Sequence, residues 1–436
     1  MKKGVVVVLV LLAVIVLASP AIVGRLAEEK MDENLNWAAT ESGEVTVTSE
    51  HFDRGWFSSE GQHRVELGEG QIMAALRSKG SHTDPDELPA LIINTHIDHG
   101  LIPLGSVGSE QPSLSPGLGS AESTMQLEMP GGEIIGVPGK IFSKISLGGQ
   151  LHSTYALGPG SAEIDDATLV WGTTEINVET DPSSGEVAFD GSIGSLSIED
   201  ANDGVSLGSM TFNGHQQPTT YGFATGEVEF ALSDVEIAGM NGGAIREMAV
   251  ASTTTLDGDE VGGDATFLMT LEGHPQFAEV TLDMAMTIAG ADAASLGRVT
   301  QQLKAADSGA DPIAFYASVE TDLKQLFARG FELNFDKFDL TVPQGTVNTV
   351  IKVSISEEDP ATFAWTSLLL NAEASVDLSI PAELLEAFTQ DNPEAAMIVG
   401  GGYLLKRDDA YIMEAELKKG LLTINGAPIP IPLGFN

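Results

Sequence analysis

The residues best suited to metal chemistry form the run His96-Ile97-Asp98-His99. In an extended strand alternate side chains point to opposite faces, so His96 and Asp98 share one face and His99 faces the other. A zinc site needs at least three protein ligands that converge on one point. The other histidines are scattered along the chain: His51, His63, His82, His152, His215 and His274. We therefore expect a polar strand end here and no metal site.

A serine hydrolase is the second chemistry that the sequence suggests. Gly204-Val205-Ser206-Leu207-Gly208 matches the GxSxG pattern of these enzymes. The pattern works where the serine lies on a sharp turn between a strand and a helix, which exposes its Oγ. Here it follows the turn Asn202-Asp203-Gly204 and precedes another apparent strand at residues 210–212. In a chain with 48 glycines such a match arises by chance, so we expect no catalytic serine.

The motifs of other cofactor sites do not occur. Asp257-Gly258-Asp259-Glu260 and residues 199–204 look like calcium loops at first sight, but neither has the EF-hand spacing with its closing glutamate. The sequence also contains no GxGxxG, P-loop or HExxH motif. We therefore predict a non-enzymatic protein without a bound cofactor.

Charge and cysteine content exclude further classes. The 436 residues include 63 Asp and Glu against 21 Lys and Arg, which gives a net charge of −42. Nucleic-acid partners are excluded, because their affinity comes from neutralising phosphates with cations. With no cysteine, the chain has neither disulfides nor thiolate metal sites. A dense carboxylate surface keeps a protein hydrated at high salt, so we interpret the acidity as a halophilic feature.

The N-terminus predicts a membrane anchor. Lys2 and Lys3 precede an apolar run at residues 4–23, which as a helix spans a hydrocarbon core of about 30 Å. The lysine pair keeps the N-terminus in the cytoplasm and places the rest of the chain outside. The alternative is a cleaved signal peptide, for which Ser19-Pro20-Ala21 is a poor cleavage site. We expect a single-pass anchor.

The rest of the chain alternates with the period of β-strands. In residues 280–288 apolar side chains alternate with small or polar ones, as in a strand with one buried face. Residues 228–237 and 331–342 do the same with a phase shift in the middle, which indicates a bulge or turn. This pattern predicts a mainly β, α+β fold of elongated antiparallel sheets with carboxylates on their wet faces.

A few helices interrupt the strands. We predict them at residues 26–36, 291–306, 311–329 and 383–388, with a further one beginning at Pro393. Residues 104–119 are rich in Gly, Ser and Pro and predict a long loop. The predicted organisation is an anchor at 1–25, a β-rich external domain at 26–290, a helical pair at 291–330 and a C-terminal α+β region at 331–436. A hairpin at residues 406–425 closes the last region.

Several short motifs together resemble the YdgA-like family of bacterial envelope proteins. The first is the run from Phe52 to Ser59, which contains Arg54-Gly55-Trp56-Phe57, and the second is His96 to Gly100, which ends in His99-Gly100. The third is the C-terminal run from Leu421 to Pro430, with Asn425-Gly426 and Pro428. The family usually has a proline where this chain has Leu101. Trp56 and Phe57 most simply pack in the sheet, and we interpret the motif residues as structural.

The resemblance implies a protein anchored in the bacterial inner membrane, with most of its chain in the periplasm, and it assigns no catalytic residue. Two functions remain open. The first is a structural or interaction module that binds an envelope protein or forms a homodimer. The second is a carrier that holds lipid or another apolar ligand along a groove of the sheet, as AsmA-like envelope proteins, with similar aromatic strand starts, are thought to do.

Overall fold

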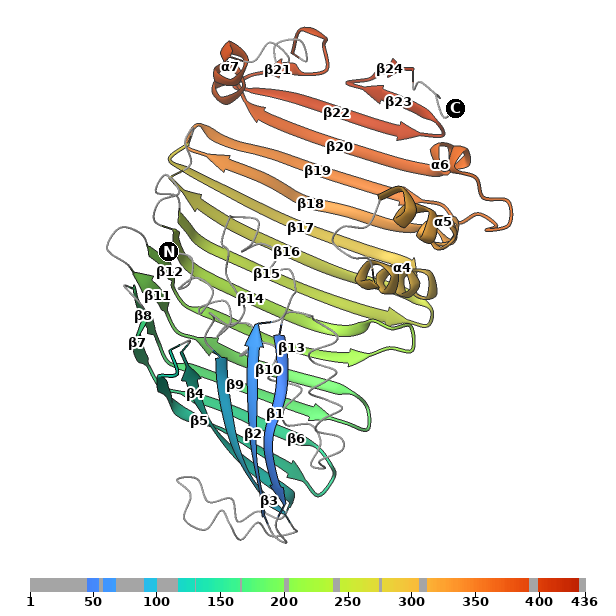
Figure 1. Cartoon of the computed structure of the whole chain (residues 1–436). Helices are drawn as coiled ribbons and strands as arrows, with labels where there is room; N and C mark the ends of the chain where they lie inside the picture. The colour runs from blue at the N-terminus through green and yellow to red at the C-terminus, as the bar shows by residue number, and fades with distance from the viewer. Residues whose placement is uncertain are drawn as a thin grey trace. The chain divides into compact units, whose positions relative to one another are not determined.

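The computed structural model describes eleven segments of the chain: residues 45–54, 58–67, 90–99, 117–129, 131–164, 167–199, 204–237, 244–273, 277–305, 312–391 and 399–430. They form strands β1 to β24 and helices α4 to α7 (Figure 1). The chain divides into two compact units. Unit 1 comprises Met1–Gln217 and Phe230–Gly242, and unit 2 comprises Pro218–Glu229 and Gly243–Asn436. Strand β14 (Ala224–Ile237) begins in unit 2 and ends in unit 1.

Unit 1 is built on an antiparallel sheet in which most strands pair with their neighbours in the chain. In spatial order its strands are β1 (Val45–Arg54), β2 (Ser58–Leu67), β3 (Ala90–His99), β4 (Gly117–Glu128), β5 (Ile134–Ser146), β6 (Leu151–Leu157), β9 (Thr174–Asp181), β10 (Glu186–Ile193) and β13 (Met210–Pro218).

A second antiparallel ribbon of unit 1 follows the order β7, β8, β11, β12 and the end of β14. Its short strands are β7 (Gly160–Ile164), β8 (Ala167–Trp171), β11 (Leu196–Glu199) and β12 (Gly204–Leu207). Leu169 and Leu196 of this ribbon pack with Leu127 and Met129 of the main sheet. These apolar contacts hold the ribbon against the sheet.

The core of unit 1 follows from period-two alternation. In β6 the odd positions from Leu151 to Leu157 are buried, whereas His152 and Ala156 are exposed. Tyr155 lies opposite Ile176 of β9 and Ile141 of β5, so the buried side chains of neighbouring strands meet on one face. The resulting cluster includes Ile93, which is 0% exposed. Burial raises the pKa of the Tyr155 hydroxyl.

Unit 2 contains a second antiparallel sheet of longer strands. In spatial order they are β15 (Ala244–Asp257), β16 (Glu260–Glu272), β17 (Glu279–Asp292), β18 (Phe331–Val342), β19 (Gly345–Ile355), β20 (Ala372–Pro381) and β22 (Ala410–Lys418). The outer edge of β22 pairs with two short strands, β21 (Leu405–Arg407) and β23 (Leu421–Ile424), and β24 (Ala427–Ile429) pairs with β23.

Two-residue turns join several of these strands. Asn425 and Gly426, with φ of 51° and 78°, link β23 to β24, and a type I′ turn requires positive φ at both of these positions. The calcium-like sequence Asp257–Glu260 is the hairpin turn between β15 and β16, where Asp257 pairs with Glu260. Both sequences therefore form hairpin turns that reverse the direction of the chain.

Among the described residues, helices α4 to α7 all belong to unit 2. Helices α4 (Ala293–Ala305) and α5 (Pro312–Arg329) connect β17 to β18, and α7 (Ala382–Asp391) follows β20, which confirms three predicted helices. The Asp292 carboxylate accepts a hydrogen bond from the backbone N–H of Ser295 and caps α4. Helix α6 (Trp365–Asn371) was not predicted, because its run of three leucines has no helical periodicity.

The mainly β, antiparallel prediction is confirmed. The phase shift in residues 331–342 is a bulge at Asp336 within the single strand β18, one of the two predicted alternatives, and residues 228–237 belong to the single strand β14. The predicted closing hairpin at 406–425 is instead a meander of β21, β22 and β23. The helical pair α4 and α5 lies within unit 2.

The predicted anchor at 1–25, the helix at 26–36, the helix beginning at Pro393 and most of the loop at 104–119 lie outside the described residues. Within the described segments, no helix combines the length and hydropathy that a membrane crossing requires.

The two glycines Gly136 and Gly139 of β5 test the packing of unit 1. Gly139 has φ of 108°, and a Cβ there would lie 2.1 Å from the carbonyl oxygen of Ala156, whereas a Cβ on Gly136 would meet nothing within 4 Å. We expect Gly139→Ala to lower the free energy of unfolding by about 2 kcal/mol or more, and Gly136→Ala to change it by less than about 0.5 kcal/mol. Urea titration followed by circular dichroism measures both, and equal midpoints would contradict the described register.

Candidate functional site

The sheet of unit 2 has one apolar and one polar face. In β17, Leu282, Met284 and Met286 point to one face, and Asp283 and Thr287 to the other. The register carries this division to the neighbouring strands, because Met284 lies opposite Phe267 of β16 and Phe338 of β18. The same division into an apolar and a polar face continues through β19, β20 and β22, because residues directly opposite each other point to the same face.

We call the first side the apolar face. Its larger members, taken strand by strand, are Ile245, Met248, Val250, Phe267, Met269, Leu271, Val280, Leu282, Met284, Met286, Leu333, Phe335, Phe338, Leu340, Val347, Ile351, Val353, Val376, Leu378, Tyr411, Met413, Leu417, Leu422 and Ile424. In strands β16 to β20, no position on this face carries a charged side chain; at the edge of the sheet Lys406 of β21 lies opposite Tyr411. From β15 to β23 the face crosses seven strand spacings of about 4.8 Å, or about 34 Å.

A bulge in β18 places two aromatic rings on this face. Phe335 and Phe338 are three positions apart and would point to opposite sides of a regular strand. Asp336 is the extra residue, since Phe335 lies opposite Met286 and Lys337 opposite Ala285. The two rings meet edge to face, with centroids 6.5 Å apart. The sequence predicted this phase shift, and the structure shows that it enlarges the apolar face.

The polar side of the bulge is held by an ion pair. Lys337 donates a hydrogen bond to Asp283, which raises the pKa of the Lys337 amine. The Thr287 hydroxyl donates to Asp336 at 3.4 Å. These contacts keep both charged side chains of the bulge on the polar face.

Much of the apolar face is accessible to solvent. Phe338 is 38% exposed and Leu340 is 37% exposed, and the neighbouring Met284 and Phe267 are half-buried. The core of unit 1 differs, since Ile93 and Leu169 are both 0% exposed. The two units therefore use the same alternation, but the larger side chains at the middle of the apolar face of unit 2 are only half-buried or exposed.

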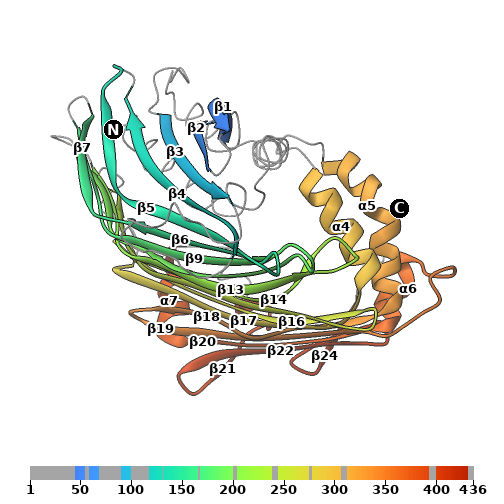
Figure 2. The same cartoon turned by 90° about the horizontal axis from the view of Figure 1, so that it is seen from below.

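Helices cover the two ends of the face. At one end Leu296 of α4 and Leu326 of α5 pack with Ile288 and Phe331. Edge-to-face aromatic contacts extend this cap. The ring centroid of Phe327 lies 5.5 Å from the ring centroids of both Phe331 and Trp365 of α6. Figure 2 shows α4 and α5 on one side of the sheet. At the other end α7 contacts β20 and β22. The middle of the face lies between these caps.

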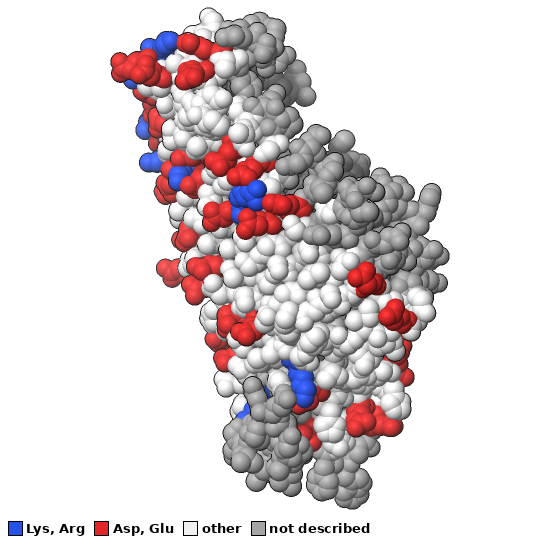
Figure 3. All heavy atoms as spheres, turned by 90° about the vertical axis from the view of Figure 1, so that its left-hand side faces the viewer, with Lys and Arg blue, Asp and Glu red and all other residues white. Residues whose placement is uncertain are grey.

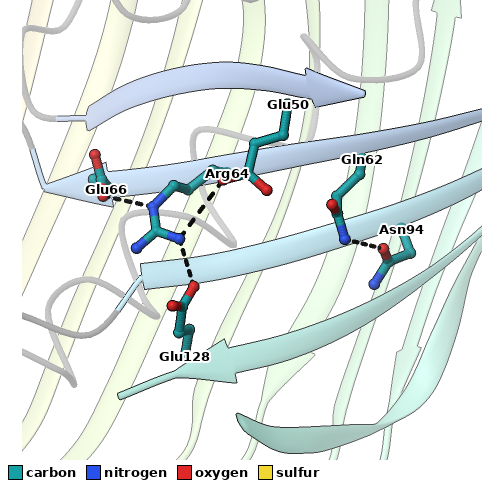
Figure 4. Close-up of polar contacts among 6 residues, drawn as sticks. All are labelled: Glu50, Gln62, Arg64, Glu66, Asn94 and Glu128. Carbon is teal, nitrogen blue, oxygen red and sulfur yellow. Dashed lines mark hydrogen bonds and ion pairs between the residues drawn. The ribbon is translucent and has the colours of Figure 1, made fainter. Parts of the chain in front are cut away.

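The remaining surface is acidic. On the side drawn in Figure 3, carboxylates outnumber lysines and arginines. In unit 1, Arg64 contacts three carboxylates: Glu66 at 2.7 Å, Glu50 at 3.7 Å, and Glu128 (Figure 4). The hydrogen bond to Glu66 is the largest influence that raises the pKa of Arg64. This guanidinium links β2 to β1 and β4, and three carboxylates surround it.

The histidine motif forms part of the same polar surface. His96 and Asp98 share a face of β3, as predicted, with Nε2 3.5 Å from the carboxylate, and His96 Nδ1 lies 3.6 Å from Glu60. Among the described residues no cluster of three or more potential ligands could hold a metal ion. Ser206 lies within β12 opposite Ser197 and Glu236, away from any strand-to-helix turn.

The family-motif residues fall in three places. Arg54 and His99 belong to β1 and β3, but their side chains are not described, and Gly55, Trp56, Phe57 and Gly100 lie outside the described residues.

Asn425 is better defined. Its side chain accepts a hydrogen bond from the Glu414 N–H and donates one to the Tyr403 carbonyl, both at 3.0 Å. Gly426 completes the turn, and Pro428 lies opposite Thr423 on the edge strand β24. Proline cannot donate a backbone hydrogen bond to a neighbouring strand, so it disfavours the pairing of a further strand with this edge.

The exposure of the apolar face can be tested by charge insertion. We expect Leu340→Glu to cost about 1 kcal/mol of unfolding free energy, because its carboxylate reaches water, whereas Ile93→Glu costs more than about 4 kcal/mol in the buried core of unit 1. Urea titration of both variants measures the difference. If Leu340→Glu unfolded the protein as fully as Ile93→Glu, the face would have to be covered.

Comparison with known proteins identifies the family. A model of bacterial sequences matches residues 1–432, nearly the whole chain. No curated protein and no solved structure matches it. The chain belongs to the family described as Bacterial protein of unknown function (DUF945).

Proposed function

We propose that this chain is a non-enzymatic envelope protein that holds the acyl chains of a lipid on the apolar face of unit 2. In this proposal residues 4–23 anchor it in the bacterial inner membrane and the body lies in the periplasm. The apolar run after Lys2 and Lys3 and the resemblance to the YdgA-like family support this location. The observation that carries the proposal is the partly exposed apolar face around Phe338 and Leu340.

The chemistry of the face favours hydrocarbon over protein. A protein partner brings backbone N–H and C=O groups, which must find hydrogen-bond partners when they are buried. Protein interfaces accordingly have about one hydrogen bond per 100–200 Å². The centre of the apolar face offers mainly thioether, aromatic and aliphatic groups, such as Met284, Phe335 and Leu282, and few donors, of which the Thr349 hydroxyl is one. Acyl chains need no such partners.

The apolar face is large enough to hold acyl chains, and their burial on it would release enough free energy for binding. The apolar face is about 34 Å across, from seven strand spacings, and the hydrocarbon core of a whole bilayer is about 30 Å thick. Each methylene transferred from water to an apolar surface contributes about 0.8 kcal/mol. Ten methylenes would therefore supply about 8 kcal/mol, against which the entropic cost of association counts. Flexible methionines adapt to chains of different length.

A homodimer or another envelope protein is the second candidate, since either could cover the same face. A large exposed apolar surface marks interaction sites of both kinds. The two candidates differ in the molecule that touches Phe338.

Photo-crosslinking of the full chain in living bacteria separates them. A benzoylphenylalanine replaces Phe338 on the apolar face, and in the control it replaces Glu332, an exposed polar-face residue of the same strand. We expect lipid adducts at 338 and few at 332, detected by mass spectrometry of the purified protein. A dominant protein adduct at 338 would support the interaction module instead. Equal lipid labelling at both positions would contradict binding at the apolar face.

A further inference from the structure

Four methionines lie next to one another on the apolar face of unit 2. Met248 of β15 is directly opposite Met269 of β16 in the register. Met269 and Met284 are diagonal neighbours on β16 and β17, and Met286 is the next apolar-face position of β17. Opposite and diagonal side chains of adjacent strands are within reach of each other. We call these four residues the methionine group.

The thioethers of the methionine group are accessible from the solvent. All four side chains are half-buried, and Phe338, directly opposite Met284, is 38% exposed. Two methionines of unit 1 differ, since Met125 and Met129 are each 7% exposed and belong to its hydrophobic clusters. A small solute can therefore reach the methionine group without any unfolding, whereas it reaches Met125 and Met129 only through a local opening of the chain.

Methionine is the sulfur-containing residue of this protein, because the sequence has no cysteine. Cysteine thiolates are oxidised stepwise to sulfenic, sulfinic and sulfonic acids, and methionine thioethers are oxidised to the sulfoxide. No thiol of this chain competes with the thioethers for an oxidant. The accessible methionines of the apolar face are therefore sulfur atoms that an oxidant in the solvent meets early.

Oxidation would change the chemistry of the face. With hydrogen peroxide, the sulfur forms an S–O bond while the O–O bond breaks, and the second oxygen leaves as water with both protons. The sulfur is oxidised by two electrons, which reduce the peroxide. The sulfoxide is polar, and burying a polar group without a hydrogen-bond partner costs free energy. The apolar face has few donors, so an acyl chain laid on a sulfoxide would leave its oxygen unsatisfied.

We propose that the methionine group is a reversible oxidation site, and that its sulfoxides prevent the apolar face from holding lipid. The effect on lipid rests on the proposed function, whereas the site itself does not. Methionine sulfoxide reductases reverse the reaction. Two electrons and two protons from a dithiol restore the thioether, and the oxygen leaves as water. Lipid binding by this chain would thus respond to peroxide and recover afterwards.

Peptide mapping of the full chain after treatment with hydrogen peroxide tests the site. We expect the methionine group to form sulfoxide at least about tenfold faster than Met125 and Met129, because the buried thioethers react only after local opening. Mass spectrometry of the peptides measures the rate at each position. In the urea-unfolded chain all these methionines should react at similar rates. Equal rates in the folded chain would contradict the site.

Photo-crosslinking tests the effect on lipid. The full chain with benzoylphenylalanine at 338, in membranes of the bacteria that produce it, is irradiated with and without prior peroxide treatment. We expect peroxide to lower the yield of lipid adduct at least about threefold, since acyl chains would have to cover sulfoxides. Methionine sulfoxide reductases and a dithiol, added before irradiation, should restore the yield.

Replacement of the methionine group by leucine separates its oxidation from other effects of peroxide. Leucine is apolar, close to methionine in volume and inert to peroxide. In the variant with Met248→Leu, Met269→Leu, Met284→Leu and Met286→Leu we expect the adduct yield to stay the same after peroxide. The matched control combines Met125→Leu and Met129→Leu and should keep the full loss. Protease resistance equal to that of the unchanged chain shows that both variants are folded.

A smaller variant serves if the fourfold replacement unfolds the protein. Met284→Leu with Met286→Leu changes one strand, and we expect it to retain more adduct after peroxide than the unit 1 control does.

The outcomes are distinguishable. Sulfoxides on the methionine group with an unchanged adduct yield overturn the effect on lipid and leave lipid binding intact. An equal loss of adduct in the leucine variant assigns the effect to another target of peroxide and also overturns it. No lipid adduct at 338 before oxidation overturns the proposed function together with the effect on lipid, whereas the peptide map still decides whether the methionine group is the oxidation site.

Discussion

Side chains in an antiparallel sheet alternate between its two faces, and this constraint decides where each apolar group of the chain lies. Backbone hydrogen bonds fix the register, so Met284 must lie opposite Phe267 and Phe338. One residue of slippage would move a whole strand's apolar set to the other face. The bulge at Asp336 is compatible with this constraint because it inserts one residue and keeps both phenylalanines on the apolar face.

The two units solve the same packing problem differently. In unit 1 the alternation of β6 and β9 produces a core in which Ile93, Tyr155 and Ile176 are nearly inaccessible to solvent. In unit 2 the helices α4, α5 and α6 cover one end of the apolar face, and α7 contacts the opposite ends of β20 and β22. The middle of the sheet has no comparable cover among the described residues. Unit 2 is therefore the better candidate for binding an apolar ligand.

The acidity of the chain serves the polar faces. Carboxylates such as Asp264 and Glu414 occupy exposed positions of strands whose other side is apolar. They keep these faces hydrated, so that one side of the sheet is polar and the other apolar. In unit 1 a similar role falls to ion pairs such as Arg64 with Glu66 and Glu128, which connect neighbouring strands. The net charge of −42 thus describes the solvent side of the sheets more than any binding site.

By itself the sequence determined the class of fold and most of its local elements. Alternation in residues 280–288 specified a two-faced strand, the phase shift at Asp336-Lys337 marked the bulge, and Asp311-Pro312 with Gly330 delimited α5. These features depend on near neighbours, whose geometry is fixed by backbone dihedrals and hydrogen-bond spacing. Helix α6 escaped prediction because its run of three leucines has no helical periodicity, whereas in the fold its Trp365 packs against the distant Phe327. Only the tertiary structure decided which apolar face is covered, since burial depends on elements far apart in the chain and not on the pattern of any one strand.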